Sequence, residues 1–177
     1  TFEQVETLTV QARQEGYDSV NFDLVYGLPL QQMESFTDTV VKVIGLQPDR
    51  IALYSYAHVP WVKPGQRKFT ELDLPSADRK LAMYQKAYEL LIAAGYVDIG
   101  MDHFSLPSDE LAKASTQKKL HRNFMGYTTE TSPLLIGLGA SAISDTGTAY
   151  AQNEKKIEDY YARVNAGELP FFKGHQM

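Results

Sequence analysis

Two periodicities alternate along this chain, and their order limits the folds that it can adopt. From Val20 to Tyr26, apolar side chains recur at every second residue, as they do on one face of a β-strand. Elsewhere apolar residues recur with the period of an α-helix, about 3.6 residues, and these runs stop at Gly16, Gly45 and Gly95. Helices are predicted over 2–15, 36–44, 76–95 and 153–166, and strands over 20–26, 50–57, 96–101 and 134–138.

The predicted order is helix–strand three times, followed by one more strand and helix. Strands that alternate with helices are typical of parallel sheets with right-handed crossovers, and no hairpin signal interrupts the pattern. Four strands are too few to close an eight-stranded β/α barrel. The predicted fold class is therefore α/β: a small open sheet, or a section of a partial parallel β/α (TIM-like) barrel with about four strands and helices on its outer face.

The composition is that of a folded domain. A chain of 177 residues that is 44% hydrophobic can bury a core, and no apolar run reaches the ~20 residues of a membrane helix. A net charge of −5 argues against a broad nucleic-acid footprint. The lack of cysteine excludes a disulfide framework and fits a cytoplasmic location. Because the chain starts at Thr1 and stops just after an aromatic pair, we expect a piece of a larger protein.

Three segments combine histidine with aromatic or charged neighbours: YAHVP at 56–60, GMDHF at 100–104 and HRNFMGY at 121–127. Ligands of parallel α/β folds bind where the carboxyl ends of strands meet. His58 and His103 follow predicted strands, so they are candidate catalytic or substrate-binding residues. A lone histidine is nevertheless more often structural.

Asp23 lies inside a predicted strand, where aspartate is disfavoured. A carboxylate that faces a barrel interior needs a partner, because burial of an unpaired charge is costly. Two interpretations stay open. Asp23 is an acid that binds a ligand, or it forms a structural salt bridge with Arg50 or Arg122.

Other polar groups allow further hypotheses. Gly137–Ser141 resembles the start of a phosphate-binding turn, but Ala142 replaces its third glycine, so a tight strand exit is the better interpretation. Four basic residues in loops either pair with substrate carboxylates or are solvated surface charges. They are Lys63, Arg67, Lys68 and Arg122.

A metal site is a further alternative. Asp23, His58, Asp102 and His103 offer metal-ligand chemistry, which would fit a metal-dependent barrel hydrolase. However, neither an HxH nor an HExxH spacing supports a metal.

Six segments in order resemble one family: NFDLVYGLP (21–29), YAHVP (56–60), GMDHF (100–104), HRNFMGYTT (121–129), GLGASAIS (137–144) and YAQN (150–153). Together they are similar to oxygen-independent coproporphyrinogen III oxidases over residues 1–175. The resemblance implies a radical S-adenosylmethionine oxidoreductase of porphyrin and haem biosynthesis with an open β/α barrel. A [4Fe–4S] cluster generates a 5′-deoxyadenosyl radical in that family. Two propionates of coproporphyrinogen III are then decarboxylated to vinyls, which gives protoporphyrinogen IX.

The resemblance also implies roles for single residues. The S-adenosylmethionine contacts that it implies are Asp23, Ala57, Ile143 and Tyr54. We expect Asp23, Ala57 and Ile143 to converge at one end of the sheet. The candidate catalytic or substrate residues are His58, His103, Arg122 and Phe124. Met125 replaces the glutamine expected there, so no role is given to it.

The chain departs from the family pattern in one respect. The family's Cys-x3-Cys-x2-Cys cluster ligands are missing, so we expect no metal ligand in this chain and no activity from it alone. Residues 1–177 would be one partial domain, the C-terminal part of the barrel. The cluster-binding N-terminal part and a helical C-terminal domain would lie outside it.

The expected partner is a tetrapyrrole substrate, with no nucleic acid and no membrane. The full enzyme is expected to be monomeric, and the fragment to self-associate at the cut edge of its sheet. A haem-trafficking branch of the same superfamily is the nearest alternative, but GMDHF and HRNFMGY favour the oxidase.

Overall fold

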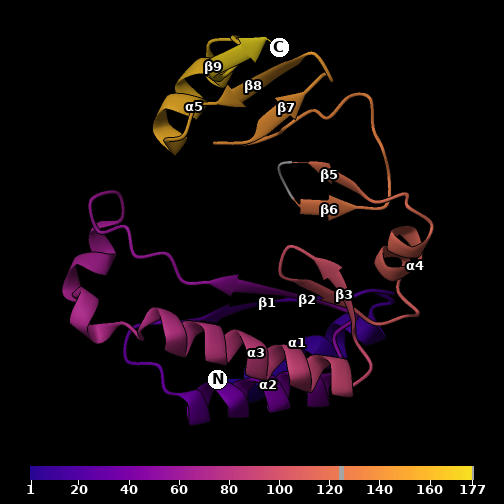
Figure 1. The fold of residues 1–177 in the computed structure, drawn as a ribbon. Coiled ribbons are helices and arrows are strands. Elements are labelled where there is room, and N and C mark those ends of the chain that lie inside the picture. Colours follow the sequence, from indigo (N-terminus) through magenta and orange to yellow (C-terminus); the bar gives the residue numbers. More distant parts are fainter. Residues whose placement is uncertain (124–125, 177) are drawn as a thin grey trace. The chain divides into compact units, whose positions relative to one another are not determined.

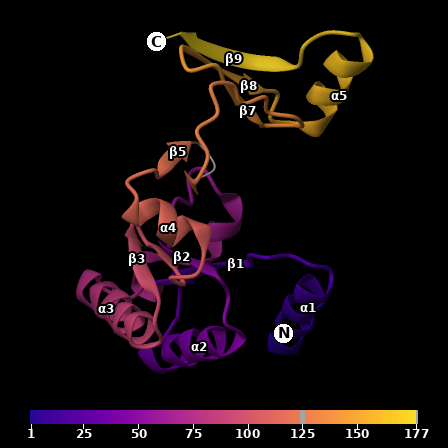
Figure 2. The same cartoon turned by 90° about the vertical axis from the view of Figure 1, so that its right-hand side faces the viewer.

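The structure, a computed structural model, describes residues 1–123 and 126–176, in two compact units, Thr1–Lys118 and Lys119–Met177. Each unit is described by itself (Figures 1 and 2). The helices of the first unit are α1 (Phe2–Gln14), α2 (Met33–Leu46), α3 (Ala77–Ala93), α4 (Glu110–Thr116) and two short 3₁₀ turns, Pro64–Lys68 and Glu71–Asp73. Its strands are β1 (Asn21–Tyr26), β2 (Arg50–Ser55), β3 (Val97–Gly100) and β4 (His103–Ser105).

The four strands of the first unit form one sheet in the order β1-β2-β4-β3. β1 and β2 pair in parallel, with α2 as the connection between them, as the alternating periodicities predict. Both strands are confirmed, and so are the helices that precede and follow them in the sequence, α1, α2 and α3. The resulting architecture is mixed α/β.

The prediction of four parallel strands is only partly right: β1, β2 and β3 run in the same direction, but an unpredicted strand, β4, lies between β2 and β3 and runs antiparallel to both. The chain reverses through Met101 and Asp102, whose φ angles are 46° and 66°. Two consecutive positive φ angles are typical of the tight hairpin turn whose twist matches that of the flanking strands. The sequences Asn-Gly and Asp-Gly predict such a turn, whereas Met-Asp does not.

The apolar core lies on one face of this sheet. Figures 1 and 2 show α2 and α3 side by side along that face, as predicted for the helices that follow β1 and β2. Every second side chain of a strand points toward the helices. These side chains pack against the apolar residues that recur on one face of each helix. The buried cluster is Phe36, Val40, Val43, Ile51, Leu53, Met83, Ala87, Leu91, Tyr96 and Phe104.

The second unit is built from antiparallel pairs. Its elements are β5 (His121–Asn123), β6 (Gly126–Thr128), β7 (Ile143–Asp145), β8 (Ala149–Asn153), α5 (Ile157–Asn165) and β9 (Phe171–Gln176). β5 pairs with β6, and β7, β8 and β9 form an antiparallel sheet in that order, with α5 in the connection from β8 to β9. The expectation that the chain lacks hairpins is therefore wrong.

The strand predicted over 134–138 does not form. One isolated bridge joins Leu135 to Asp145, and the chain beyond it becomes a loop. Gly137 and Gly139 explain the difference, because glycine weakens a strand and φ of Gly139 is 98°. The last predicted helix starts later than expected, at Ile157, because 149–153 is a strand.

Candidate functional site

The sheet face opposite α2 and α3 carries polar residues in register. Asp23 of β1 pairs with Ala52 of β2, and Ala52 pairs with His103 of β4. Paired residues of neighbouring strands point to the same face, so Asp23 and His103 flank the small side chain of Ala52. Their Cα atoms are about 10 Å apart, which is twice the usual spacing of strands. Two of the predicted site residues are thus in one row.

Asp23 is exposed, and its Oδ1 accepts a hydrogen bond of 2.9 Å from Nδ2 of Asn21. The salt bridge to Arg50 is not formed, because Nε of Arg50 instead donates to Oδ1 of Asp109 at 2.8 Å. The other suggested partner, Arg122, belongs to the second unit, where its guanidinium lies 5.2 Å from the ring centroid of Tyr127. Asp23 therefore has a neutral neighbour and no ion pair among the described residues of its own unit.

Tyr54 extends the polar face toward the carboxyl end of β2. Its ring stands edge-on to that of His103, with 6.1 Å between the centroids. Nδ1 of His103 lies 2.7 Å from the carbonyl oxygen of Met101 in the hairpin turn. The turn therefore fixes one ring nitrogen of His103 and leaves its ring packed against Tyr54.

The exit of β2 is held by a lysine that the sequence did not single out. Nζ of Lys80 donates to the carbonyl of Tyr56 at 3.0 Å. On its way the side chain passes Gly27, where a Cβ atom would come within 2.7 Å of Cε of Lys80. The φ angle of Gly27, 77°, favours glycine at this residue. The bond from Lys80 ties α3 to the backbone that follows β2.

Ala57 and His58 lie just beyond this exit. Ala57 is exposed, and its carbonyl accepts a 3.1 Å hydrogen bond from Nε2 of Gln66. Nδ1 of His58 lies 3.5 Å from the hydroxyl of Tyr56. The bond from Gln66 fixes the backbone where a ligand would approach Ala57.

The three basic residues of the following loop, Lys63, Arg67 and Lys68, are all exposed. Nε of Arg67 donates to the carbonyl of Pro60 at 3.1 Å and thereby closes the loop on itself. Their exposure favours the interpretation as solvated surface charges.

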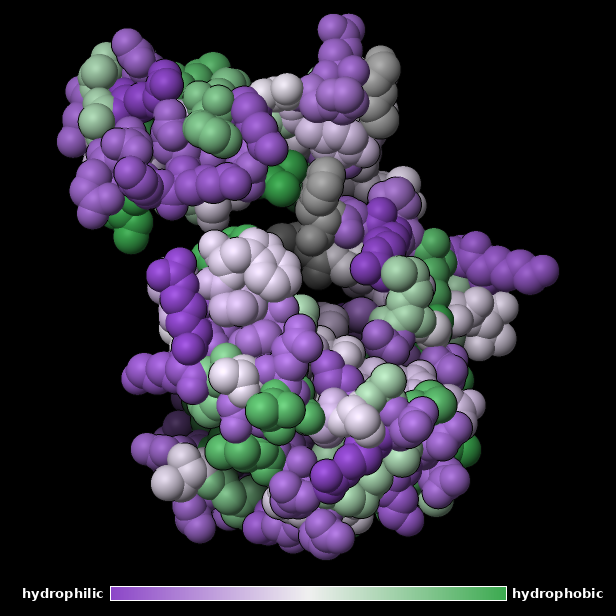
Figure 3. Space-filling view, turned by 60° about the vertical axis from the view of Figure 1, so that its left-hand side comes forward, coloured by the Kyte–Doolittle hydropathy of each residue, from purple (hydrophilic) through white to green (hydrophobic). Residues whose placement is uncertain are grey.

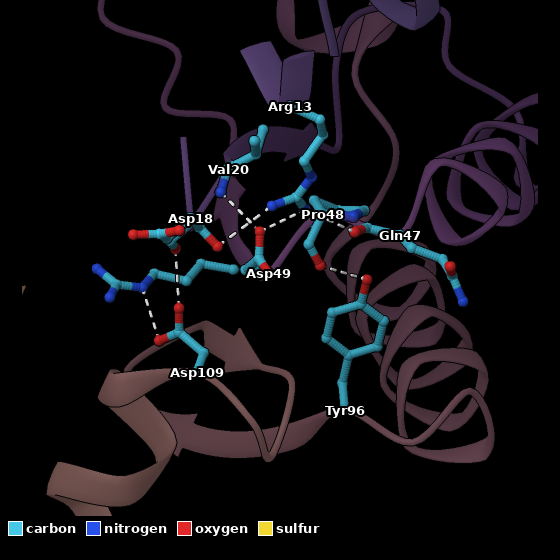
Figure 4. A network of polar contacts seen from close by, with 10 residues as sticks. Arg13, Asp18, Val20, Gln47, Pro48, Asp49, Tyr96 and Asp109 are labelled. Atoms are coloured by element: carbon cyan, nitrogen blue, oxygen red, sulfur yellow. Dashed lines mark hydrogen bonds and ion pairs between the residues drawn. The ribbon is translucent and has the colours of Figure 1, made fainter. Parts of the chain in front are cut away.

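A polar network ties together the opposite, amino-terminal end of the sheet (Figure 4). Asp109 accepts hydrogen bonds from Ser19, Arg50 and the backbone N–H of Leu111, at 2.7–2.8 Å. Burial alone would raise the pKa of Asp109, but these donors outweigh it and hold that pKa below its usual value.

The same network includes Asp49, which pairs with Arg13 at 2.5 Å and accepts from the N–H of Val20 at 2.7 Å. The hydroxyl of Tyr96 donates to the carbonyl of Pro48 at 2.7 Å, and burial raises the pKa of Tyr96 to about 12. This network lies at the sheet end that serves stability rather than ligands in such folds. We assign this network to folding.

In the second unit, a buried asparagine organises the glycine loop. Nδ2 of Asn153, whose residue is only 3% exposed, donates to the carbonyls of Gly137 at 3.1 Å and Gly139 at 2.9 Å. A Cβ atom on Gly137 would lie 2.7 Å from the carbonyl oxygen of Ile143. The loop and the backbone of Ile143 thus fit together with no space for a side chain at residue 137.

The predicted site residues therefore fall into separate groups. Asp23, Tyr54 and His103 share one sheet face, whereas Ile143 and Arg122 belong to the other unit. The convergence of Asp23, Ala57 and Ile143 stays a prediction. Phe124 and Met125 lie outside the described residues.

Two further features bear on the classes of function. Across residues 1–123 and 126–176, no group of three or more histidine, aspartate or glutamate side chains is placed to hold a metal ion. The ligand cluster that a metal-dependent hydrolase would need is thus not assembled from Asp23, His58, Asp102 and His103. Within those same ranges, no helix has the length and apolar character needed to cross a membrane.

The outer edge of β1 borders a groove of about 520 Å³ between α1 and α2. β1 is an edge strand among the described residues, so one side of its backbone has no ladder partner there. Large apolar side chains such as Phe2, Val5 and Val25 are exposed. Figure 3 shows hydrophobic residues in patches on the surface.

The whole chain is similar to one segment of known proteins. It is 49% identical to the oxygen-independent coproporphyrinogen III oxidase of Pseudomonas aeruginosa over 174 residues, 98% of this chain and 38% of that protein. The protein of the same name from Escherichia coli K12 is 47% identical over 172 residues, 97% of this chain and 38% of the relative. No family model matches the chain.

A solved structure, described as "Coproporphyrinogen III oxidase (HemN) from Escherichia coli is a Radical SAM enzyme", matches with a TM-score of 0.94. It is 44% identical, and the match covers 100% of this chain and 41% of that one. The resemblance carried by the six sequence motifs is confirmed. The chain spans about two fifths of the length of these proteins.

Proposed function

We propose that this chain is part of the barrel of an oxygen-independent coproporphyrinogen III oxidase. The observation that carries this proposal is the likeness to proteins of that name along essentially the whole chain, at 41–49% identity. Residues 1–177 would form the C-terminal part of the barrel. The cluster-binding part and a helical domain would be supplied by the rest of the protein.

We also propose that the first unit is a section of a partial parallel β/α barrel. The parallel pair β1–β2, with α2 and α3 on one face, has the arrangement of two successive β/α barrel units. The antiparallel β4 and the hairpins of the second unit would then be additions to a partial parallel barrel.

The chain fits one of the two implied cofactors. An iron–sulfur cluster needs thiolate ligands, and the chain has no cysteine. For S-adenosylmethionine, Asp23 offers a carboxylate without an ion pair in its unit, and Tyr54 offers an exposed ring on the same sheet face. Bound next to a reduced cluster, S-adenosylmethionine supplies the species that abstracts hydrogen from the substrate.

In this proposal each residue has a limited task. The carboxylate of Asp23 accepts hydrogen bonds from donors of the cofactor. Ala57 contributes exposed backbone held by Gln66, and Ile143 contributes an apolar contact. The residues that would face the tetrapyrrole or the reacting groups are His58, His103, Arg122 and Phe124.

The substitution Asp23→Asn in the full-length protein tests the cofactor site. It keeps the shape but removes the charge, so affinity for S-adenosylmethionine should fall by roughly 10- to 150-fold, the equivalent of one charge-assisted hydrogen bond. Equilibrium dialysis measures the affinity, and the absorbance of the cluster should stay unchanged. The thermal unfolding midpoint should also stay unchanged, because Asp23 is exposed and bonds only to Asn21 in the described structure.

The matched control is Asp18→Asn, another exposed aspartate of the first unit, which should leave affinity unaltered. Normal cofactor affinity in Asp23→Asn together with a lower unfolding midpoint would remove Asp23 from the site and restore the structural interpretation. Tight haem binding without oxidase activity in the wild-type protein would favour the haem-trafficking alternative.

The proposed function also carries expectations about self-association, location and partners. The open edge of β1 predicts self-association of the isolated chain, which light scattering would detect. A cytoplasmic location, a monomeric full enzyme and the lack of a nucleic-acid partner stay predictions.

A further inference from the structure

A hollow of about 460 Å³ lies on one face of the β7–β8–β9 sheet. All three strands contribute to it, so its walls are fixed by the ladder hydrogen bonds rather than by a loop. Its lining residues are Ile143, Tyr150, Gln152, Lys173, Gly174 and His175.

The strand register explains why these side chains share one face. Ile143 pairs with Gln152, and Gln152 pairs with Lys173, which makes one row across the sheet. Tyr150 pairs with His175 in the next row. The apolar side chain of Ile143 thus lies at one end of a row whose other end is the ammonium-bearing Lys173.

The chemistry of the hollow is that of a site for an anion. Lys173 contributes an ammonium group, and His175 and Tyr150 contribute groups that can donate hydrogen bonds. No carboxylate belongs to the lining. Asp145 lies on the same sheet face, but its Oδ1 accepts a 2.7 Å hydrogen bond from the N–H of Gly147.

The ammonium of Lys173 is available for such a partner. Among residues 1–123 and 126–176 it has no ion pair with a carboxylate. Gln152, next to it in the row, donates through Nε2 to the carbonyl of Ser141 at 3.2 Å. The hollow is therefore joined to the glycine loop that Asn153 holds.

We propose that this hollow binds a carboxylate carried on a larger apolar body, with Lys173 as its main partner and His175 beside it. This inference rests on the proposed function, which supplies two ligands of that kind: a propionate of the tetrapyrrole and the amino-acid carboxylate of S-adenosylmethionine. The apolar side chain of Ile143 suits the body of either ligand. The competing explanation is that a lysine on the edge strand β9 only prevents pairing with other chains.

The test is Lys173→Met in the full-length protein, with two titrations. Coproporphyrin III, the fluorescent oxidised form that keeps the propionates, should bind roughly 10- to 150-fold more weakly, as expected for a lost charge-assisted contact. Lys173→Arg should retain most of the affinity. Lys156→Met removes an exposed lysine of the same unit that makes no capping bond and should change nothing.

A second titration with S-adenosylmethionine identifies the source of the carboxylate. Weaker binding of the cofactor in place of the porphyrin would support the site and assign it to the cofactor's carboxylate. Unchanged binding of both ligands by a folded Lys173→Met protein would overturn the inference and leave the proposed function intact. A wild-type protein that bound neither ligand would overturn both.

Discussion

In the first unit, apolar side chains from two helices and the sheet meet in one core. In the described part of the second unit, by contrast, the only buried residue is Asn153. All buried hydrophobic residues of the described chain precede residue 115. A unit of about 60 residues that buries so little apolar surface has little stability of its own. The first unit is therefore a framework, and the second is a set of strands and loops shaped by hydrogen bonds.

The largest effect should come from Phe104→Ala in the core of the first unit. Phe104 is fully buried between β2 and β3, and its ring lies 5.8 Å from that of Tyr88. Such a cavity costs about 3–5 kcal/mol of the free energy of unfolding. Urea denaturation of the full-length protein measures the loss, and a loss below about 1 kcal/mol would show that this core is not the framework.

A smaller effect is expected from Asp109→Ala, which removes charge and acceptors from the polar network. The loss should be about 2–3 kcal/mol, because Arg50 and two further donors lose their acceptor. The pKa of Asp109 is lowered in the folded state, so its contribution is complete above the ordinary value of 3.8 and disappears as the pH falls through the lower folded value.

The pH dependence separates this contribution from that of packing. The difference in unfolding free energy between wild type and Asp109→Ala should shrink as the pH falls below about 4. The matching difference for Phe104→Ala should not change over that range. Equal pH profiles for both variants would contradict the assignment of Asp109.

The smallest effect on global stability should come from Asn153→Ala, although this residue is the buried one in the second unit. Two carbonyls lose a donor, at a cost of about 1–3 kcal/mol. We expect that cost to be local, with faster hydrogen exchange of the amides between 137 and 144. Mass spectrometry of exchanged peptides checks this, with the peptides of α3 as an internal control.

The comparison between the units would fail if Asn153→Ala unfolded the whole protein as readily as Phe104→Ala. Weaker binding of S-adenosylmethionine by Asn153→Ala, at an unchanged unfolding midpoint, would strengthen the contrast between the two units. Asn153 would then be a positioning residue for Ile143, whose carbonyl packs against the glycine loop.

The same division explains what the sequence could predict. Period-2 and helical patterns predicted the elements from β1 to β3, because those elements pack on one core and alternation reflects burial. They also predicted α1, whose apolar residues are mostly exposed. β4 was missed because its turn uses Met101 and Asp102 without the usual glycine. The strands of the second unit show no clear alternation, since most of their side chains are only partly buried on either face.

Site residues were predictable where the strand pattern fixes a face and not where a partner comes from a distant segment. The alternation of β1 placed Asp23 away from the core, as the structure has it. No local pattern could have revealed that Arg50 pairs with Asp109, or that Lys80 reaches the carbonyl of Tyr56. Both contacts depend on how helices pack on the sheet.

The two-residue turn between β3 and β4 has a consequence for the order in which the sheet forms. A hairpin closes by local contacts within about 1–10 μs, whereas the pairing of β2 with β4 must first close a long loop. We therefore expect the hairpin to form early and to add to β2 as a preformed unit. The β1–β2 pair and the β3–β4 hairpin would then form separately. The sheet would be completed when β4 of the hairpin pairs with β2.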